Sequence, residues 1–113
     1  MKLNLSIDGL KPFQKKLLAK ADPARIQKVI RINIAELTDT AQSKVPVSTG
    51  QLRKSIVASI EDDGMAGIVR TEAEYAEYVE LGTRFMEAQP YMKPAFEEQK
   101  PKFLRDLKRE ISK

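Results

Sequence analysis

The chain has 113 residues, which leaves room for one domain, and 42% of them are apolar and 32% charged, a globular composition. It contains neither cysteine nor histidine, which excludes disulfides, thiolate nucleophiles, His-ligated metals and Ser-His-Asp triads. No apolar run is long enough to span a membrane, and the first residues lack the apolar block of a secretory signal. We therefore expect one soluble domain over residues 1–113, without a membrane partner, that stays in the cytosol of the cell that makes it.

Charge is distributed unevenly along the chain, although the net charge is only +4. Residues 1–31 carry a local charge of +6, residues 61–80 carry −6 and residues 100–113 carry +4. Such segregation fits either solvated helix faces or complementary patches through which copies of the chain, or a neighbour, meet. The basic balance also admits a small nucleic-acid-binding protein, which we keep as the alternative function. Against that alternative, the Lys and Arg residues are not interleaved with aromatic side chains that would stack on bases.

The first 21 residues predict a strand and a short helix. Residues 2–7 alternate strictly between polar and apolar, which is the period of a half-buried strand. Residues 10–21 predict a basic helix with Pro12 near its first turn, where a missing N–H costs little. The apolar stripe of this helix consists of Leu10, Phe13 and Leu17.

A long helix is predicted over residues 24–44. Asp22-Pro23 is a helix start, because the carboxylate accepts hydrogen bonds from free N–H groups and Pro presets φ at the first helical position. Apolar residues then recur at steps of three and four, at Ile26, Val29, Ile30, Leu37 and Ala41. Ile32 and Ile34 widen this stripe, so the helix is expected to pack on two sides.

The middle of the chain predicts one helical turn at 48–52 and a β-hairpin at 55–71. Ser48 and Gln51 have the spacing of a capping box, which favours the helical turn. Residues 55–60 alternate as a strand, the Asp-Asp-Gly sequence at 62–64 favours a turn, and residues 66–70 return as the second strand.

Two more helices follow the hairpin. Thr71 and Glu74 have capping-box spacing, which predicts a helix over 72–81 that ends at a left-handed Gly82. Residues 83–89 are predicted to be an irregular or weak strand segment, and residues 90–94 are predicted to be extended, because a residue that precedes Pro avoids the helical region. Pro94 opens a last helix that Pro101 should kink or divide, and its apolar stripe consists of Phe96, Phe103, Leu104, Leu107 and Ile111.

The elements add up to an α+β fold, in which a small antiparallel sheet packs against one long helix, with additional N- and C-terminal helices. Catalytic constellations are nearly absent. Glu77 and Glu80 lie one helical turn apart, as a carboxylate pair would, but a Glu-rich surface helix explains the spacing equally well. We expect a non-enzymatic protein with no catalytic, cofactor-binding or metal-binding residues and no cofactor.

Three segments carry more constraint than packing alone requires: 45–55 (VPVSTGQLRKS), 75–83 (YAEYVELGT) and 89–96 (QPYMKPAF). Their order and spacing resemble the head–tail joining, or tail-completion, family of long-tailed bacteriophages and related prophages. The signatures of that family read approximately P-V-x-T-G-x-L-(R/K)-x-S, then Y-A-x-x-V-E-x-G-T, then Q-P-(F/Y)-(L/M)-(R/K)-P-A. This chain departs from the pattern at Ser48, Glu77 and Leu81, where the family often has Asp, Pro and Phe.

The resemblance implies a structural protein of the virion, located at the head–tail interface and assembled in the cytoplasm of the bacterial host. It implies a ring that joins the capsid connector to the tail. The partners would be other copies of the chain, the head connector or stopper protein, and the tail tube or terminator protein, without specific nucleic-acid binding. The free subunit is expected to be a monomer in which residues 83–93 order only on assembly.

Ten residues of these segments are predicted to shape the fold: Thr49, Gly50, Leu52, Arg53, Ser55, Glu80, Gly82, Thr83, Pro90 and Pro94. Thr49-Gly50 sets the turn before the first hairpin strand, and Leu52 anchors that turn in the core. Arg53 is expected to bridge to a carboxylate, with Glu80 as the candidate partner. The two prolines stiffen the segment between them.

Six further residues are candidates for an interface: Tyr75, Tyr78, Arg84, Phe85, Met86 and Tyr91. Tyrosine offers an apolar body with a polar tip, which suits an interface as well as the edge of a core. Interface use and fold maintenance are therefore equally open alternatives for these positions.

Overall fold

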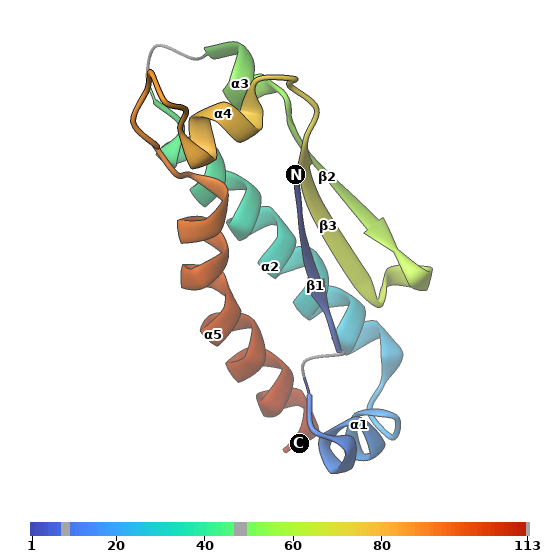
Figure 1. Ribbon diagram of the computed structural model, residues 1–113. Coiled ribbons are helices and arrows are strands. Elements are labelled where there is room, and N and C mark those ends of the chain that lie inside the picture. The colour runs from blue at the N-terminus through green and yellow to red at the C-terminus, as the bar shows by residue number, and fades with distance from the viewer. Residues whose placement is uncertain (8–9, 47–49, 113) are drawn as a thin grey trace.

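A computed structural model describes residues 1–7, 10–46 and 50–112 of the chain (Figure 1). In chain order the elements are β1 (Lys2–Ser6), α1 (Pro12–Leu18), α2 (Pro23–Lys44), α3 (Gly50–Lys54), β2 (Ile56–Glu61), a 3-10 turn η2 (Asp62–Gly64), β3 (Ala66–Thr71), α4 (Ala76–Leu81) and α5 (Met92–Ile111). The α+β class predicted from the sequence is confirmed. In the described part of the chain, no helix is both long and apolar enough to cross a membrane.

The sheet has three antiparallel strands in the order β1-β3-β2, so β1 and β2 form its two edges. In the register of the strands, Leu3 and Ala58 lie on either side of Val69, which places all three on the same face. The loop between β2 and β3 takes positive φ at Asp62, Asp63 and Gly64, a conformation that Asp and Gly adopt most readily. The predicted strands and turn are confirmed to within about one residue at each end.

Helix α2 lies across one face of the sheet, and its predicted start is confirmed. The Asp22 carboxylate accepts a hydrogen bond from the Ala24 N–H at 3.0 Å. The whole predicted stripe is buried. Gly67 in β3 lets the helix approach closely, because a Cβ there would clash with Ile34. Ile34 is buried as expected, whereas Ile32 is exposed and does not widen the stripe.

Helix α5 runs antiparallel beside α2, as Figure 1 shows, and buried amide groups join the two helices. Gln99 Nε2 donates to Asn33 Oδ1 at 2.6 Å and to Glu36 Oε2 at 3.0 Å. Asn33 Nδ2 donates in turn to Asp106 Oδ2 at 3.1 Å. Because a satisfied buried polar network permits only one alignment of its partners, these contacts fix how the two helices slide along each other.

Helices α4 and α5 begin at other residues than the sequence predicts. Helix α4 begins at Ala76 and not at residue 72, because Thr71 belongs to β3 and its hydroxyl lies 2.9 Å from the Ser55 hydroxyl instead of capping a helix. Helix α5 begins at Met92, two residues before Pro94, and continues unbroken through Pro101. The Glu97 carbonyl, which loses its helical donor to Pro101, belongs to an exposed residue that water can reach.

The N-terminal helix also buries a different face than expected. Helix α1 spans only Pro12–Leu18, and Leu18 is its buried side chain, together with Leu10 just before the helix. Phe13 and Leu17, predicted to form the stripe with Leu10, are exposed. These two side chains are one helical turn apart and therefore share a solvent-facing side of α1.

Candidate interaction surface

A buried carboxylate ties α4 to the start of α5. Glu80, in the last turn of α4, accepts hydrogen bonds through Oε1 from the N–H groups of Tyr91 at 3.1 Å and Met92 at 2.8 Å. Its Oε2 accepts from the Lys93 N–H at 3.2 Å. Pro94, the next residue, has no N–H to satisfy. One side chain thus occupies the free donors at the helix start, where a negative charge also interacts favourably with the helix dipole.

This arrangement corrects the predicted ion pair between Arg53 and Glu80. Arg53 Nε donates instead to the Gln42 carbonyl at 3.1 Å, which ties α3 to the last turn of α2. The backbone N–H groups at the start of α5 provide Glu80 with three aligned donors in the core, whereas the Arg53 side chain is exposed. The same contacts explain why α5 begins earlier than Pro94, since Glu80 stabilises a helical turn at residues 91–93.

The remaining structural positions divide into buried anchors and turn residues. Leu52 is fully buried, as predicted. Ser55 Oγ donates to the Leu52 carbonyl at 2.6 Å and also meets Thr71, so it closes α3 against the end of β3. Gly50 opens α3 without a positive φ, and no described atom would lie within 4 Å of a Cβ there. Thr49 lies outside the described residues.

Residues 82–89 form a turn that its own backbone bonds hold. Thr83 N–H donates to the Met86 carbonyl at 2.8 Å, and Met86 N–H returns a bond of 3.2 Å. Thr83 Oγ1 accepts from the Phe85 N–H at 3.1 Å. Gln89 N–H donates to the Val79 carbonyl at 2.8 Å, which fastens the end of the turn to α4. These bonds all lie within one chain. That residues 83–93 order only on assembly stays a prediction.

Large apolar side chains stand exposed on α4 and this turn. We name this set the apical surface: Tyr75, Tyr78, Leu81, Phe85 and Met86. Leu81 is 72% exposed and Phe85 is 89% exposed, the highest value among the large apolar residues that the structure describes. The guanidinium of Arg84 lies 5.3 Å from the centre of the Phe85 ring. A group of exposed aromatic and other large apolar side chains is typical of protein–protein contact surfaces.

The apical surface therefore unites four of the predicted interface residues and adds one that sequence reasoning missed. Leu81 follows Tyr78 by three residues, and the two share a side of α4, which is the pattern that could have identified it. Tyr91 is the exception among the predicted positions. Its side chain is fully buried, so it is part of the core and offers nothing to a partner. Pro90 is exposed next to the turn, and Pro94 is half-buried in the first turn of α5.

The burial of Tyr91 predicts a gain in stability when its hydroxyl is removed. None of the described side chains meets hydrogen-bond geometry with this hydroxyl. Thr71 acts to lower the pKa of Tyr91, but the Thr71 hydroxyl is bonded to Ser55. A buried hydroxyl without a partner costs about 1–3 kcal/mol. We expect Tyr91→Phe to raise the free energy of unfolding by about 1 kcal/mol in urea titrations at pH 7. An unchanged or lower value would mean that the hydroxyl is satisfied.

The same residue sets an alkaline limit to stability. Burial raises the pKa of Tyr91 above its ordinary value of 10.0, and the negative charge of Glu80 adds to this effect. Because the unfolded chain ionises first, stability is intact below pH 10 and falls as the pH rises from there toward the raised folded-state pKa, by up to about 1.4 kcal/mol per pH unit. Tyr91→Phe should remove this part of the slope, measured by unfolding at several pH values between 9 and 11.

The molecule is also long and thin, which increases the surface that it leaves uncovered. It extends over 51 × 21 × 18 Å, with a radius of gyration of 15.6 Å against roughly 13 Å for a compact domain of this length. Its accessible surface is 7253 Å², compared with roughly 6,300 Å² for a compact monomer of this mass. The apical surface lies at one end of this rod, and α1 with Phe13 and Leu17 lies at the other (Figure 1).

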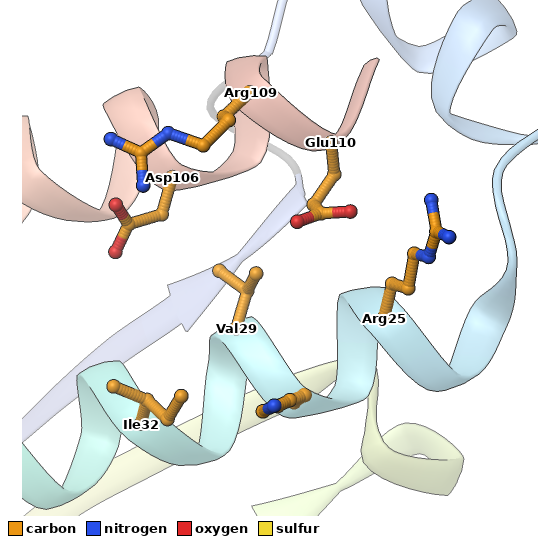
Figure 2. Close-up of a pocket in the computed structure, with 7 residues that line it drawn as sticks. Arg25, Val29, Ile32, Asp106, Arg109 and Glu110 are labelled. Atoms are coloured by element: carbon orange, nitrogen blue, oxygen red, sulfur yellow. The ribbon is translucent and has the colours of Figure 1, made fainter. Parts of the chain in front are cut away.

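A cleft lies between α2 and α5 at the end of the molecule near α1. This cleft of about 350 Å³ is lined by Arg25, Lys28, Val29, Ile32, Asp106, Arg109 and Glu110. Figure 2 shows Arg25 on α2 across from Glu110 on α5, with Arg109 next to Glu110 in the chain and Asp106 one helical turn before it. Carboxylates thus stand among the cations, so a phosphate backbone would meet repulsion there as well as attraction. The cleft does not have the uniformly basic lining that the nucleic-acid-binding alternative would use.

Comparison with known proteins agrees with a role in contacts between virion proteins. Residues 8–82 match a family model described as "Bacteriophage HK97-gp10, putative tail-component". The match takes in most of the chain but ends at Gly82, so the exposed turn and α5 lie beyond it. No curated protein and no solved structure gives a significant match. Because the match covers well over half of the chain, the protein belongs to the HK97-gp10-like family of bacteriophage tail components.

Proposed function

We propose that this protein is a non-enzymatic structural component of the phage particle that joins the capsid connector to the tail, assembled as a ring. The observation that carries the proposal is the apical surface. Its most exposed side chain, Phe85, stands on a turn that is held by three backbone–backbone bonds, one bond to the Thr83 hydroxyl and the Glu80 contacts. A protein whose work is to fit other chains benefits from such a surface, because little entropy is lost when it binds.

The shape of the chain supports two different contacts per subunit. A closed ring requires a heterologous interface, in which two unlike patches of the same protein complement each other, and a joining protein also needs an axial partner. A specific contact covers about 800 Å² on each partner, so several such contacts fit on 7253 Å² of surface. The exposed pair Phe13 and Leu17, at the end opposite the apical surface, is available to an axial neighbour.

Disruption of the gene in the producing phage tests the joining role. We expect the lysate to contain filled heads and separate tails that do not attach to each other, visible by electron microscopy. Supplying the intact gene in trans should restore joined particles. Particles that join normally without the protein would contradict the proposal. Head and tail assembly serve as internal controls, since a general defect in expression would reduce both.

A further inference from the structure

An apolar groove runs between the edge strand β1 and helix α5. It consists of two adjoining hollows, of about 270 and about 190 Å³, which share Phe96 as a common wall. Leu3 and Met92 line the first hollow with Phe96, and Phe103 and Leu104 line the second. Lys2, Lys93 and Lys100 also line these hollows and are exposed, which places positive charge at the rim. The buried Glu80 lines the first hollow too, but its carboxylate is engaged by the backbone N–H groups at the start of α5. We name this feature the β1–α5 groove.

The apical surface carries a side chain that suits such a groove. Phe85 is 89% exposed in its own chain and so does not occupy that chain's groove. An aromatic ring buries roughly 150–250 Å² when a partner encloses it. Three exposed charged residues flank Phe85: Glu77 on α4, Glu87 in the turn, and Arg84, whose guanidinium lies 5.3 Å from the centre of the ring. The two carboxylates outnumber the one guanidinium, so the segment around Phe85 has a net negative charge, whereas the groove is rimmed by lysines.

We infer that Phe85 of one copy inserts into the β1–α5 groove of a second copy. The inference rests on the proposed ring, and it names the two unlike patches that a ring requires. Apolar contact supplies the attraction at the centre, and the acidic and basic groups around it set the orientation of the subunits. A buried aromatic anchor within a charged rim is the arrangement that concentrates binding energy in one residue.

The absence of cysteine from the chain allows a direct crosslinking test. Arg84→Cys places a thiol beside Phe85, and Lys93→Cys places one at the groove, while both leave the apolar contact intact. Full-length Arg84→Cys and Lys93→Cys proteins are mixed, treated with a short bismaleimide and separated on denaturing gels. We expect about tenfold more covalent dimer from the mixture than from either protein alone. The double variant should give a ladder of linked subunits.

A matched pair of aromatic substitutions then identifies the contact. Phe85→Ala in the double variant should reduce the ladder about tenfold or more, as expected for the loss of a central anchor. Phe13→Ala, which removes an exposed ring at the opposite end of the rod, should leave it unchanged. Native mass spectrometry of the chain without introduced cysteines, alone and with the phage's tail proteins, reports whether oligomers form.

The outcomes separate the inference from the function on which it rests. If oligomers form but Phe85→Ala does not weaken the ladder, the inference is wrong and the proposed ring stands. If Phe85→Ala abolishes binding to a tail or head protein while subunits still associate, the apical surface faces an axial partner and the inference is again wrong. If no oligomer forms under any of these conditions, the ring and the inference are both overturned.

Discussion

Replacing Glu80 by Gln is expected to lower the free energy of unfolding by roughly 2–4 kcal/mol. The carboxylate accepts three backbone N–H bonds at the start of α5 within the core, and hydrogen bonds to a charged group contribute about 1.5–3 kcal/mol each in stability measurements. Gln keeps the shape but loses the charge, and its NH₂ group turns a donor toward one of the three donors. Urea unfolding followed by circular dichroism measures the loss.

The matched control is Glu77→Gln, since Glu77 is exposed on the same short helix. We expect it to change the stability by less than about 0.5 kcal/mol. Limited trypsin digestion adds a local measurement, because Arg84 lies in the turn that α4 and α5 hold between them. Cleavage after Arg84 should be slow in the wild type and in Glu77→Gln and fast in Glu80→Gln. Equal stability and equal cleavage in all three proteins would show that Glu80 does not fasten the turn.

The long helix and the hairpin could be predicted because their signals are local. The Asp22-Pro23 start of α2 involves neighbouring residues, and the apolar residues of this helix recur every three or four positions. The alternation of polar and apolar residues in the strands likewise requires no knowledge of distant partners. The capping-box pattern at Thr71 and Glu74 misled for the opposite reason. Thr71 finds a tertiary partner in Ser55, sixteen residues away, and strand pairing extends to Thr71, the residue that was expected to cap the helix.

The role of Glu80 could not be predicted because its partners are backbone groups. Charge pairing suggested Arg53, yet the groups that bind the carboxylate are N–H groups eleven to thirteen residues further on, which every residue except Pro carries. The amide network of Asn33 and Gln99 was missed for a related reason. Its two members are 66 residues apart, and each alone resembles an ordinary polar residue on a helix. The exposed Phe85 was recognised only as one alternative, since exposure depends on the path of the whole turn.

Replacing Gly82 by Ala should destabilise the apical end of the molecule by roughly 2–4 kcal/mol. Gly82 has φ 77° and ψ 173°, a backbone conformation that residues other than glycine rarely adopt. A Cβ there would also lie 2.7 Å from the Ala88 nitrogen and 2.9 Å from the Met86 carbonyl oxygen. Both obstacles are backbone atoms of the exposed turn, so relief of the clash requires the turn itself to move. Urea unfolding measures the loss of stability.

Gly50→Ala is the matched control, because Gly50 also belongs to one of the three motif segments but has no described atom within 4 Å of an added Cβ and no positive φ. Ala within α3 should be neutral or stabilise the chain by about 0.5 kcal/mol, since it restricts the unfolded state. If Gly82→Ala were as harmless as Gly50→Ala, the turn would not have the backbone path described here. If Gly82→Ala instead unfolds locally, trypsin should cleave after Arg84 while α2 keeps its helical signal. The proposed insertion of Phe85 into a second copy then predicts that self-association is lost as well, because the position of Phe85 depends on the conformation of Gly82.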